Sequence, residues 1–469
     1  MINKLRSIVK TSKVLSDKES LFNASYDNTR FSFLPEVVVK IKEEDDIASV
    51  LKFAYANDIA ITPRGAGTGC CGGALPIKGG MVLDFGEYDK ISIDPLSKVA
   101  NVQAGAITAN VNKRANECGL FYPPDPSSDK YSTIGGNIAC NAGGLRACKY
   151  FTTRDYLLSA TAFLANGERL ELSLDLKKCA IGYNLRDLLV GSEGTLAVIS
   201  RVSLRLLDLP KFRLACLGTF KTQDEAFDSI NEILKSHLKP SIFEFMDAQS
   251  YYAGQKYMGK SDCNSETCSV LLEFDGNDKR DIDGSFEELK ALDCGQNFVF
   301  AKDENESQAL WQLRKICSQA SYLYADTKLN QDIVLPFDRA KDFFIEFKAK
   351  CKQGGFYSPT FGHCGDGNYH IHIMYDSKNS SQEQRAKALM SSIIERVVEL
   401  GGAISGEHAI GLSKLKYMHL QHSKATLSLM KSIKNTLDPK DILNSQKVLG
   451  NFDLYQHTPL KSLKTPWDK

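Results

Sequence analysis

The chain has 469 residues, of which 43% are hydrophobic and 25% are charged, a composition typical of a globular protein of roughly two or three domains. Its net charge of +1 excludes a strong electrostatic attraction to nucleic acid or to an anionic membrane surface. No apolar run approaches the ~18 residues that a membrane-spanning helix needs, and residues 1–20 lack the apolar core of a signal peptide. We therefore expect a cytoplasmic protein that begins with a surface helix and that reaches a membrane only through a partner.

The thirteen cysteines are scattered along the chain, and no two of them have C-x-x-C spacing. Zinc ribbons and local iron–sulfur motifs need such closely spaced thiolates, so neither is predicted. The simplest interpretation is a set of reduced thiols in a cytosolic protein. Any redox electrons must then leave this chain through a partner or a diffusible acceptor.

The first predicted structural unit covers residues 36–63 and reads as strand, helix and strand. "VVVKI" is rich in β-branched residues, and "IAIT" forms the second strand. Either Asp45 or Asp46 is the predicted helix cap, because a carboxylate can accept hydrogen bonds from the first free backbone N–H groups. The helix itself is indicated by apolar residues at helical spacing: Ile47, Val50, Leu51 and Ala54. The sequence therefore predicts a βαβ unit.

A glycine-rich stretch, "PRGAGTGCCGGALPIKGGMVLDF", covers residues 63–85. Gly67, Gly69 and Gly72 spell G-x-G-x-x-G, but the stretch runs into the strand "MVLDF" and leaves no room for a helix. This excludes a Rossmann site, in which the loop must open directly into a helix. Two interpretations remain: an irregular loop, or a nest of backbone N–H groups that faces phosphate oxygens, with Arg64 adding charge-assisted bonds.

Two further glycine-bearing regions follow, "YPPDPSSDKYSTIGGNIACNAGG" at 122–144 and "LLVGSEGTLAVISRVSLRLL" at 188–207. The first is stiffened by prolines and carries two glycine pairs, and the second contains a tight turn at Gly191–Gly194 before an alternating strand. Three such regions beside β-rich segments indicate one extended ligand, longer than a phosphate group, that lies across several loops. A dinucleotide has this length.

The carboxy-terminal half has a different character, with a junction predicted at 208–214, "DLPKFRL". Strand-like and helix-like segments alternate over 211–355, which predicts an α+β domain with an antiparallel sheet.

Three of the eight histidines lie in residues 361–372, "FGHCGDGNYHIH". "YHIHIMY" alternates like a strand, so His370 and His372 share one face, and a turn at Gly365–Gly367 folds His363 over the same face. Glu407 and His408 lie in a second glycine-flanked cluster, "GGAISGEHAIG". Two imidazoles and a carboxylate are the ligands of an open catalytic zinc site, but surface histidines at a loop boundary fit the spacing equally well.

Together, "PRGAGTGCCGGA", "PPDPSS…STIGGNIACNAGG" and "GSEGTLAVI" resemble the three FAD-binding stretches of the FAD-linked oxidase family, which shares its fold with vanillyl-alcohol oxidase. The resemblance implies an α+β protein with a two-subdomain PCMH-type FAD-binding domain, a cap with an antiparallel sheet, and a C-terminal segment that returns to the flavin. The last of these is "LDPKDILNSQK" at 437–447. The implied FAD-binding residues are Arg64, Gly65, Gly67, Thr68 and Gly69 in the first stretch, Pro124, Asp125, Thr133, Gly135, Gly136 and Asn137 in the second, Glu193, Gly194 and Ile199 in the third, and Asn444. No histidine precedes His237, so we expect FAD to be bound non-covalently.

"GHCGDGNYH" and "SGEHAIG" resemble two motifs of the D-2-hydroxyacid dehydrogenase branch of that family, with Ala409 where glycine is usual. By this resemblance, a divalent metal, most simply zinc, is bound by His363, His370 and Glu407, and His408 is the catalytic base. Asp366 and Asn368 then hold the turn. The implied substrate-binding residues are Arg314, which grips the carboxylate, Lys328 and His372.

The resemblance implies a FAD-dependent dehydrogenase that oxidises a small D-2-hydroxy acid, glycolate or D-lactate, to the 2-oxo acid. In that scheme the metal lowers the pKa of the hydroxyl, His408 takes its proton, and hydride passes from C2 to flavin N5. Electrons then go to a quinone, an iron–sulfur partner subunit or an electron-transfer flavoprotein. The alternatives are a D-2-hydroxyglutarate dehydrogenase, a flavin-dependent transferase of the same fold, and a non-catalytic flavin subunit of a complex.

The predicted domain order begins with an N-terminal helical extension at 1–30 and a FAD-binding domain at 31–210. A substrate and cap domain with the metal site follows at 211–430, and a segment at 431–469 packs back on the FAD domain. The oligomeric state stays open between a dimer and a subunit of a larger complex.

Overall fold

The computed structural model describes residues 1–176, 178–460 and 463–466, and it divides into two compact units. Unit 1 contains Met1–Gly143, Thr152–Leu209 and Glu407–Lys469, and unit 2 contains Gly144–Phe151 and Pro210–Gly406. One boundary between the two units falls between Leu209 and Pro210. Unit 2, however, ends at Gly406 and not near residue 430, and it also includes the short segment at 144–151.

The first sheet of unit 1 has the strand order β1-β2-β4-β3. It consists of β1 (Lys13–Leu15), β2 (Val37–Lys40), β3 (Ile61–Arg64) and β4 (Met81–Asp84). Both β2 and β3 pair with β4 in parallel, and α3 (Glu44–Ala56) connects β2 to β3, as the βαβ prediction requires. The glycine-rich stretch enters β4 without an intervening helix. The exclusion of a Rossmann site therefore holds.

The predicted cap of α3 is wrong. The residue before the helix is Glu43, which makes no side-chain cap, and both Asp45 and Asp46 lie inside the first turn. The carboxylate of Asp46 instead accepts the backbone N–H groups of Lys10 and Ser12 at 2.7 and 2.8 Å. A buried carboxylate binds any converging backbone donors, and here the N-terminal segment supplies them.

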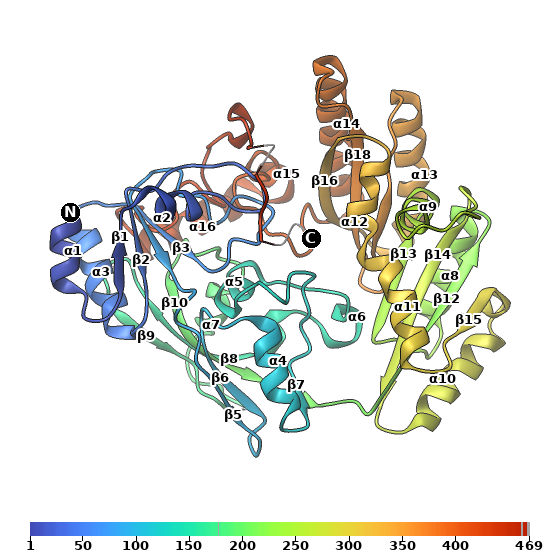
Figure 1. The fold of residues 1–469 in the computed structure, drawn as a ribbon, viewed down its shortest axis with the longest axis horizontal. Helices are drawn as coiled ribbons and strands as arrows, with labels where there is room; N and C mark the ends of the chain where they lie inside the picture. Colours follow the sequence, from blue (N-terminus) through green and yellow to red (C-terminus); the bar gives the residue numbers. More distant parts are fainter. Residues whose placement is uncertain (177, 461–462, 467–469) are drawn as a thin grey trace. The chain divides into compact units, whose positions relative to one another are not determined.

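The second sheet of unit 1 has the order β5-β6-β10-β8-β9 and is antiparallel. Its strands are β5 (Ile91–Asp94), β6 (Val99–Gln103), β8 (Leu157–Phe163), β9 (Arg169–Leu172) and β10 (Val198–Arg205). Helices α4 (Thr108–Asn116) and α5 (Ile134–Cys140) pack against β5, β6 and β10 (Figure 1). The remaining elements of unit 1 are α1 (Ile2–Ile8), α2 (Lys18–Asn23), β7 (Leu120–Phe121), η1 (Thr153–Tyr156), α7 (Arg186–Leu189), β11 (Leu207–Asp208), η4 (Leu415–Tyr417), α15 (Met418–Gln421), α16 (Lys424–Leu437) and η5 (Leu454–Gln456).

The C-terminal part of unit 1 returns to its N-terminal strands, so that red and blue segments lie side by side in Figure 1. The backbone N–H of Ile61 donates to Ile442 at 2.7 Å, and the N–H of Asn444 donates to Ile61 at 2.8 Å. A small apolar core seals this return: Phe31, Leu75, Leu412 and Leu454. Residues 442–444 of the C-terminal segment therefore pack beside strand β3 within unit 1.

Unit 2 is built on one seven-stranded sheet with the order β15-β12-β14-β13-β17-β18-β16. All of its neighbouring strands pair antiparallel, as the α+β interpretation predicts. The strands are β12 (Phe212–Phe220), β13 (Ile242–Met246), β14 (Cys268–Gly276), β15 (Phe298–Phe300), β16 (Thr327–Val334), β17 (Thr360–His363) and β18 (Asn368–Tyr375).

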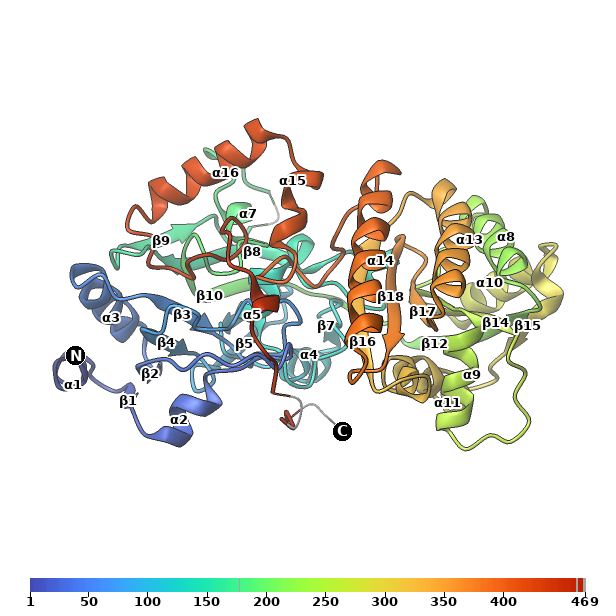
Figure 2. The same cartoon turned by 90° about the horizontal axis from the view of Figure 1, so that it is seen from above.

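Helices cover both faces of this sheet (Figure 2). One face carries α8 (Gln223–Lys235), α10 (Lys279–Ala291), α13 (Phe337–Gly354) and α14 (Ser380–Glu399), and the other carries α9 (Ala248–Tyr257), α11 (Glu304–Lys315) and α12 (Cys317–Ala320). The unit also contains α6 (Ala147–Tyr150), η2 (Gly295–Asn297) and η3 (Ser321–Leu323). Both sides of the strands are therefore covered by helices, and this explains why every residue of β18 is buried.

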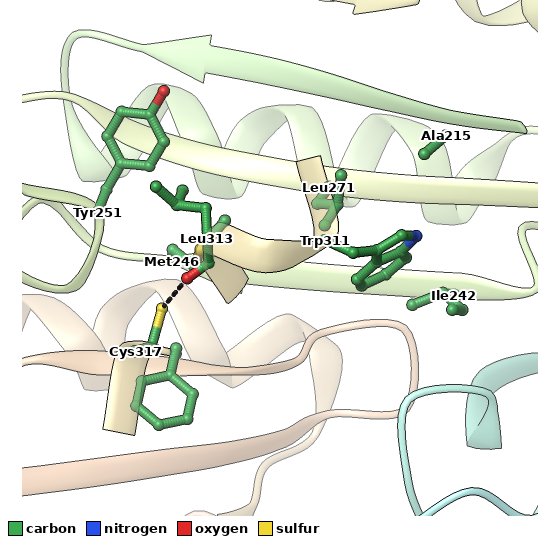
Figure 3. Close-up of a cluster of buried hydrophobic side chains, with 9 residues drawn as sticks. Ala215, Ile242, Met246, Tyr251, Leu271, Trp311, Leu313 and Cys317 are labelled. Carbon is green, nitrogen blue, oxygen red and sulfur yellow. Dashed lines mark hydrogen bonds between the residues drawn. The ribbon is translucent and has the colours of Figure 1, made fainter. Parts of the chain in front are cut away.

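The two faces have separate cores. Under α8 and α13, Phe227, Phe245, Phe344 and Tyr369 form an aromatic cluster with ring centroids 4.8–6.4 Å apart. Under α9 and α11, the core contains Ile242, Met246, Tyr251, Leu271, Trp311, Leu313 and Cys317 (Figure 3). Trp311 and Leu313 fix the rotation of α11 about its axis, so the direction of Arg314 beside them is fixed as well.

Among the described residues, no helix is both long enough and apolar enough to cross a lipid bilayer.

Candidate functional site

The first glycine-rich loop begins where β3 ends, at Arg64, a side chain that is 6% exposed. Its Nη2 donates to the carbonyl of Asn23 at 3.4 Å, while its Nη1 is buried and has no hydrogen-bond acceptor in the described part of the chain. Asp27 nearby is also buried, and one of its carboxylate oxygens, Oδ2, has no hydrogen-bond donor in the described part of the chain. Burial raises the pKa of Asp27, and the charge of Arg64 acts against that rise. A buried guanidinium with an unused N–H group is suited to bind an anion.

The glycines of this loop differ in what surrounds them. A Cβ atom at Gly65 would overlap the Thr133 hydroxyl, and one at Gly67, which has φ +75°, would overlap the Arg64 guanidinium. By contrast, a Cβ at Gly69 would meet no heavy atom within 4 Å. The first two glycines therefore serve packing inside the protein, and Gly69 presents bare backbone to open space. Thr68 before it is half-buried.

The second stretch forms the entry to α5. Thr133 is the N-cap, and its hydroxyl accepts the N–H of Gly136 at 3.3 Å. Gly135 must be glycine because a Cβ there would lie 2.8 Å from the Cβ of Ala104. Asn137 is 3% exposed and donates to the Thr108 hydroxyl at 2.7 Å. Of the other predicted residues in this stretch, Pro124 is buried and Asp125 is half-buried.

The third stretch turns at Glu193 and Gly194, with φ +53° and +71°. A non-glycine residue in this conformation costs about 1–3 kcal/mol, which indicates that a specific contact holds Glu193 there. Its carboxylate accepts the N–H groups of Ile410 and Gly411, each at 2.8 Å. Burial raises the pKa of Glu193, and these two N–H donors act against that rise. Ile199, the third predicted residue, lies in β10.

Asn444 joins the third stretch to the first. Its side-chain amide donates to the carbonyls of Gly73 at 2.9 Å and Glu193 at 2.6 Å. Lys447 continues the same connection and donates to Leu75 at 2.6 Å. The three predicted loops and the returning segment therefore form one hydrogen-bonded assembly within unit 1. The unused guanidinium nitrogen of Arg64 and the open face of Gly69 are features that an anionic dinucleotide would satisfy, so these residues fit FAD.

In unit 2, the histidines lie on one face of the sheet, as the strand alternation predicts. Phe361 of β17 pairs with His370 of β18, and the turn between these strands brings His363 beside His370. The two imidazole rings are 5.4 Å apart and nearly perpendicular, with ring nitrogens within 4.8 Å of each other. Asp366 holds this turn by accepting the N–H of Asn368 at 3.1 Å, which agrees with the role predicted for it.

Glu244 of β13 is a functional candidate that the sequence analysis missed. It is fully buried, and one carboxylate oxygen is hydrogen bonded to Nδ1 of His363. The other oxygen accepts the Nε–H of Arg314 at 2.5 Å. Glu244 therefore links a predicted metal ligand to the predicted carboxylate-binding cation. The available signal was an acidic residue in the otherwise apolar strand "SIFEFM".

Phe361 lies between the groups on this face. The Arg314 guanidinium is 4.6 Å from its ring centre, and the rings of His370 and His372 are each 5.3 Å from it. His372 is thus buried beside the same aromatic ring, with 1% of its surface exposed. Two predicted substrate-binding residues, Arg314 and His372, and the predicted metal ligand His370 therefore surround one aromatic ring.

Lys328 has other partners. It lies in β16, four residues before Asp332, which pairs with His370 in the sheet, so roughly 13 Å of strand separate the two positions. Its amine donates to the carbonyl of Ser318 at 2.6 Å and to that residue's hydroxyl at 2.8 Å. These contacts of Lys328 therefore suit anchoring of α12 to β16.

Glu407 and His408 follow the last residue of unit 2. Within unit 2, the backbone N–H of Gly406 donates to Asp332 at 2.8 Å, and Asp332 is fully buried in the strand beside His370. Within unit 1, the carboxylate of Glu407 lies against Gly143, where a Cβ would come within 3.3 Å of it. The Nε2 atom of His408 is 3.7 Å from the Glu407 carboxylate. Asp332 was not predicted, because its role depends on a loop 74 residues away.

Two family models match this chain: "FAD binding domain" over residues 35–173 and "FAD linked oxidases, C-terminal domain" over residues 209–448. The protein belongs to the FAD-linked oxidase family. It is 33% identical to the glycolate oxidase subunit GlcD of Bacillus subtilis (strain 168), over 91% of this chain and 92% of that protein. It is 32% identical to a D-lactate dehydrogenase of Anaerostipes hadrus, over 88% of this chain and 89% of that protein.

Among solved structures, an alkyldihydroxyacetonephosphate synthase superposes with a TM-score of 0.75. The match covers 95% of this chain and 85% of that one at 18% identity, so it supports the fold alone. The predicted α+β fold, the FAD-binding domain and the assignment as a FAD-linked oxidoreductase are confirmed by these comparisons.

Proposed function

We propose that the protein oxidises a small D-2-hydroxy acid to the corresponding 2-oxo acid, with glycolate or D-lactate as the best candidates. The names of the two relatives support this substrate class. The observation that carries the proposal is the array on one face of unit 2, where Glu244 connects His363 to Arg314 beside His370. A cation for a carboxylate and two imidazoles in one buried place suit an α-hydroxy acid.

Arg314 binds the substrate carboxylate in this proposal. Its Nε–H is committed to Glu244, and this bond and the stacking over Phe361 fix the plane of the guanidinium. The terminal N–H groups of an arginine in a fixed plane form a fork that matches a carboxylate. Held in this way, the substrate loses rotational freedom before the reaction begins.

The proposed metal ligands are His363, His370 and Glu407, and the donor set suits zinc. The contact of His363 with Glu244 supports this choice. If Nδ1–H donates to the carboxylate, the ring is in the tautomer whose lone pair lies on Nε2, and histidine ligands in metal sites commonly have such a carboxylate partner. A bound divalent ion would supply Lewis acidity toward the substrate hydroxyl.

His408 is the proposed base that accepts the hydroxyl proton. Its neighbour Glu407 is close enough to stabilise the imidazolium form that results. FAD, when bound, supplies the acceptor for the hydride that leaves C2 of the substrate. His408 is 22% exposed at its side chain, so the proton can pass on to solvent.

We further propose that the electrons leave to a separate acceptor: a quinone, an iron–sulfur partner subunit or an electron-transfer flavoprotein. All thirteen cysteines lie in the described part of the chain and none of them forms a disulfide, and their scatter along the sequence gives no local cluster site. The cytoplasm, with contact to a membrane through a partner, is the location that suits such an acceptor.

The test is an anaerobic titration of the FAD-loaded protein with glycolate, D-lactate, L-lactate and D-2-hydroxyglutarate, followed by the visible absorbance of the flavin. We expect bleaching by a D-2-hydroxy acid, and no bleaching by the L-enantiomer. His408→Ala should slow the bleaching by roughly 100- to 10,000-fold, the usual contribution of a general base.

The matched control is His419→Ala, which removes an exposed histidine of α15 in the same unit and should leave the rate unchanged. If no 2-hydroxy acid bleaches the flavin, the proposed activity is wrong. If bleaching occurs at the wild-type rate in His408→Ala, the activity stands and the assigned base is wrong.

A further inference from the structure

Glu193 was assigned by resemblance to the FAD-binding set, but its contacts lead elsewhere. The side chain is 6% exposed, and the backbone of the residue is anchored to α5, because its N–H donates to Ala139 at 2.8 Å. The carboxylate reaches across 217 residues of sequence to the segment that follows Glu407 and His408. All of these groups belong to unit 1.

Three contacts define the interaction. Oε1 accepts the N–H of Ile410 at 2.8 Å and that of Gly411 at 3.1 Å, and Oε2 accepts the N–H of Gly411 at 2.8 Å. Both Ala409 and Gly411 have positive φ, +66° and +51°, so the backbone winds tightly here. Successive N–H groups in such a winding form a concave anion site, and the Glu193 carboxylate occupies it.

The first glycine-rich loop, which contains Cys71, contacts the same segment from another side. The carbonyl of Cys71 accepts the N–H of Leu412 at 2.6 Å, and the thiol of Cys71 lies 3.4 Å from the carbonyl of Ala409. A Cβ at Gly411 would overlap the Cys71 carbonyl, so the two backbones are in direct contact. The residues immediately after His408 are therefore held by two of the three predicted flavin-binding stretches.

We propose that Glu193 is a positioning residue for the catalytic base: it fixes the backbone of residues 409–411 and thereby sets where the His408 imidazole lies. This inference rests on the proposed function for the role of His408, and it assigns Glu193 to the base instead of to the cofactor. Both oxygens of the carboxylate accept N–H groups of the segment that follows His408, so the side chain is directed at that segment. Two of the predicted FAD-binding stretches, the first and the third, would then hold the segment that carries the base, in addition to the cofactor.

The test compares Glu193→Gln with the wild-type protein in three measurements. Glutamine keeps the size of the side chain but replaces one acceptor oxygen with an amide NH2 group, which donates hydrogen bonds and cannot accept one. We expect faster hydrogen exchange in peptides that cover residues 405–415, a FAD dissociation constant within threefold of wild type, and a tenfold or larger fall in kcat at saturating FAD. Glu193→Asp, which keeps the charge but shortens the side chain, is the second variant if the amide does not fold.

A double variant separates this role from a general structural one. Because Glu193 acts through His408, adding Glu193→Gln to His408→Ala should lower the residual rate by less than threefold. Unchanged exchange at 405–415 in the single variant overturns the inference. So does a tenfold loss of FAD affinity with kcat retained, which would make Glu193 a cofactor contact. Full activity of His408→Ala alone refutes the proposed base, while the exchange measurement still decides whether Glu193 holds the segment.

Discussion

Gly69→Ala tests whether the first glycine-rich loop cradles the cofactor. Gly69 does not have a positive φ, and the added methyl group would meet no protein atom within 4 Å. The substitution should therefore change the free energy of unfolding of the flavin-free protein by no more than about 0.5 kcal/mol. If phosphate oxygens approach the bare backbone at this position, the same methyl group stands in their way.

We expect the FAD dissociation constant to rise at least about tenfold, which corresponds to about 1.4 kcal/mol. Thermal unfolding of the flavin-free protein measures the first quantity, and quenching of FAD fluorescence on binding measures the second. The two measurements together distinguish loss of a cofactor contact from loss of the fold.

Two variants calibrate this experiment. Gly284→Ala lies in α10 of unit 2, where a methyl group also meets nothing within 4 Å, and it should leave FAD affinity unchanged. Gly411→Ala should destabilise unit 1 strongly, because φ is +51° and the methyl group would overlap the Cys71 carbonyl. Wild-type FAD affinity in Gly69→Ala would refute the assignment of this loop to the phosphate oxygens of FAD.

Three further predictions concern two buried charges and one proposed metal ligand. Arg314→Met should destabilise the protein by about 3–5 kcal/mol in urea unfolding, because it leaves the Glu244 carboxylate buried beside His363 without its guanidinium partner. The double variant Arg314→Met/Glu244→Leu should recover most of that loss. No recovery would contradict the inference that the ion pair between Arg314 and Glu244 causes the destabilisation. Elemental analysis should find no stoichiometric divalent metal in His370→Ala. The control His237→Ala, which removes an exposed histidine of unit 2, should retain the metal. Metal retained in both variants would refute the assignment of His370 as a ligand. Burial lowers the pKa of Lys447 to about 7 from the ordinary 10.5, so between these pH values the unfolded chain binds a proton that the folded chain does not. The free energy of unfolding should therefore rise with pH from about 7. In flavin-free Lys447→Met this contribution should be absent, and identical pH profiles of the two proteins between pH 7 and 9 would contradict it.

Local patterns were sufficient wherever the physical cause is local. The parity of "YHIH" predicts that His370 and His372 share a face, because successive side chains of a strand point to opposite sides. The absence of a helix after the glycine-rich stretch excludes a Rossmann site for an equally local reason. The wrong cap of α3 shows the limit: two carboxylates at the start of a helix fit the capping pattern, but the backbone of residues 10–12 provides better donors for Asp46.

The sequence alone was enough for the class of the protein, and it predicts three flavin-binding stretches and the histidine and carboxylate residues of the candidate site, because their spacing and composition carry a local signal. Only the tertiary structure revealed that Glu244 joins Arg314 to His363, that Asp332 holds the loop before Glu407, and that Glu193 binds the backbone after His408. These partners are separated by 70 to 217 residues. A buried carboxylate must find donors, but nothing in its own neighbourhood of sequence states which ones, since the folding of distant strands and loops brings them within reach.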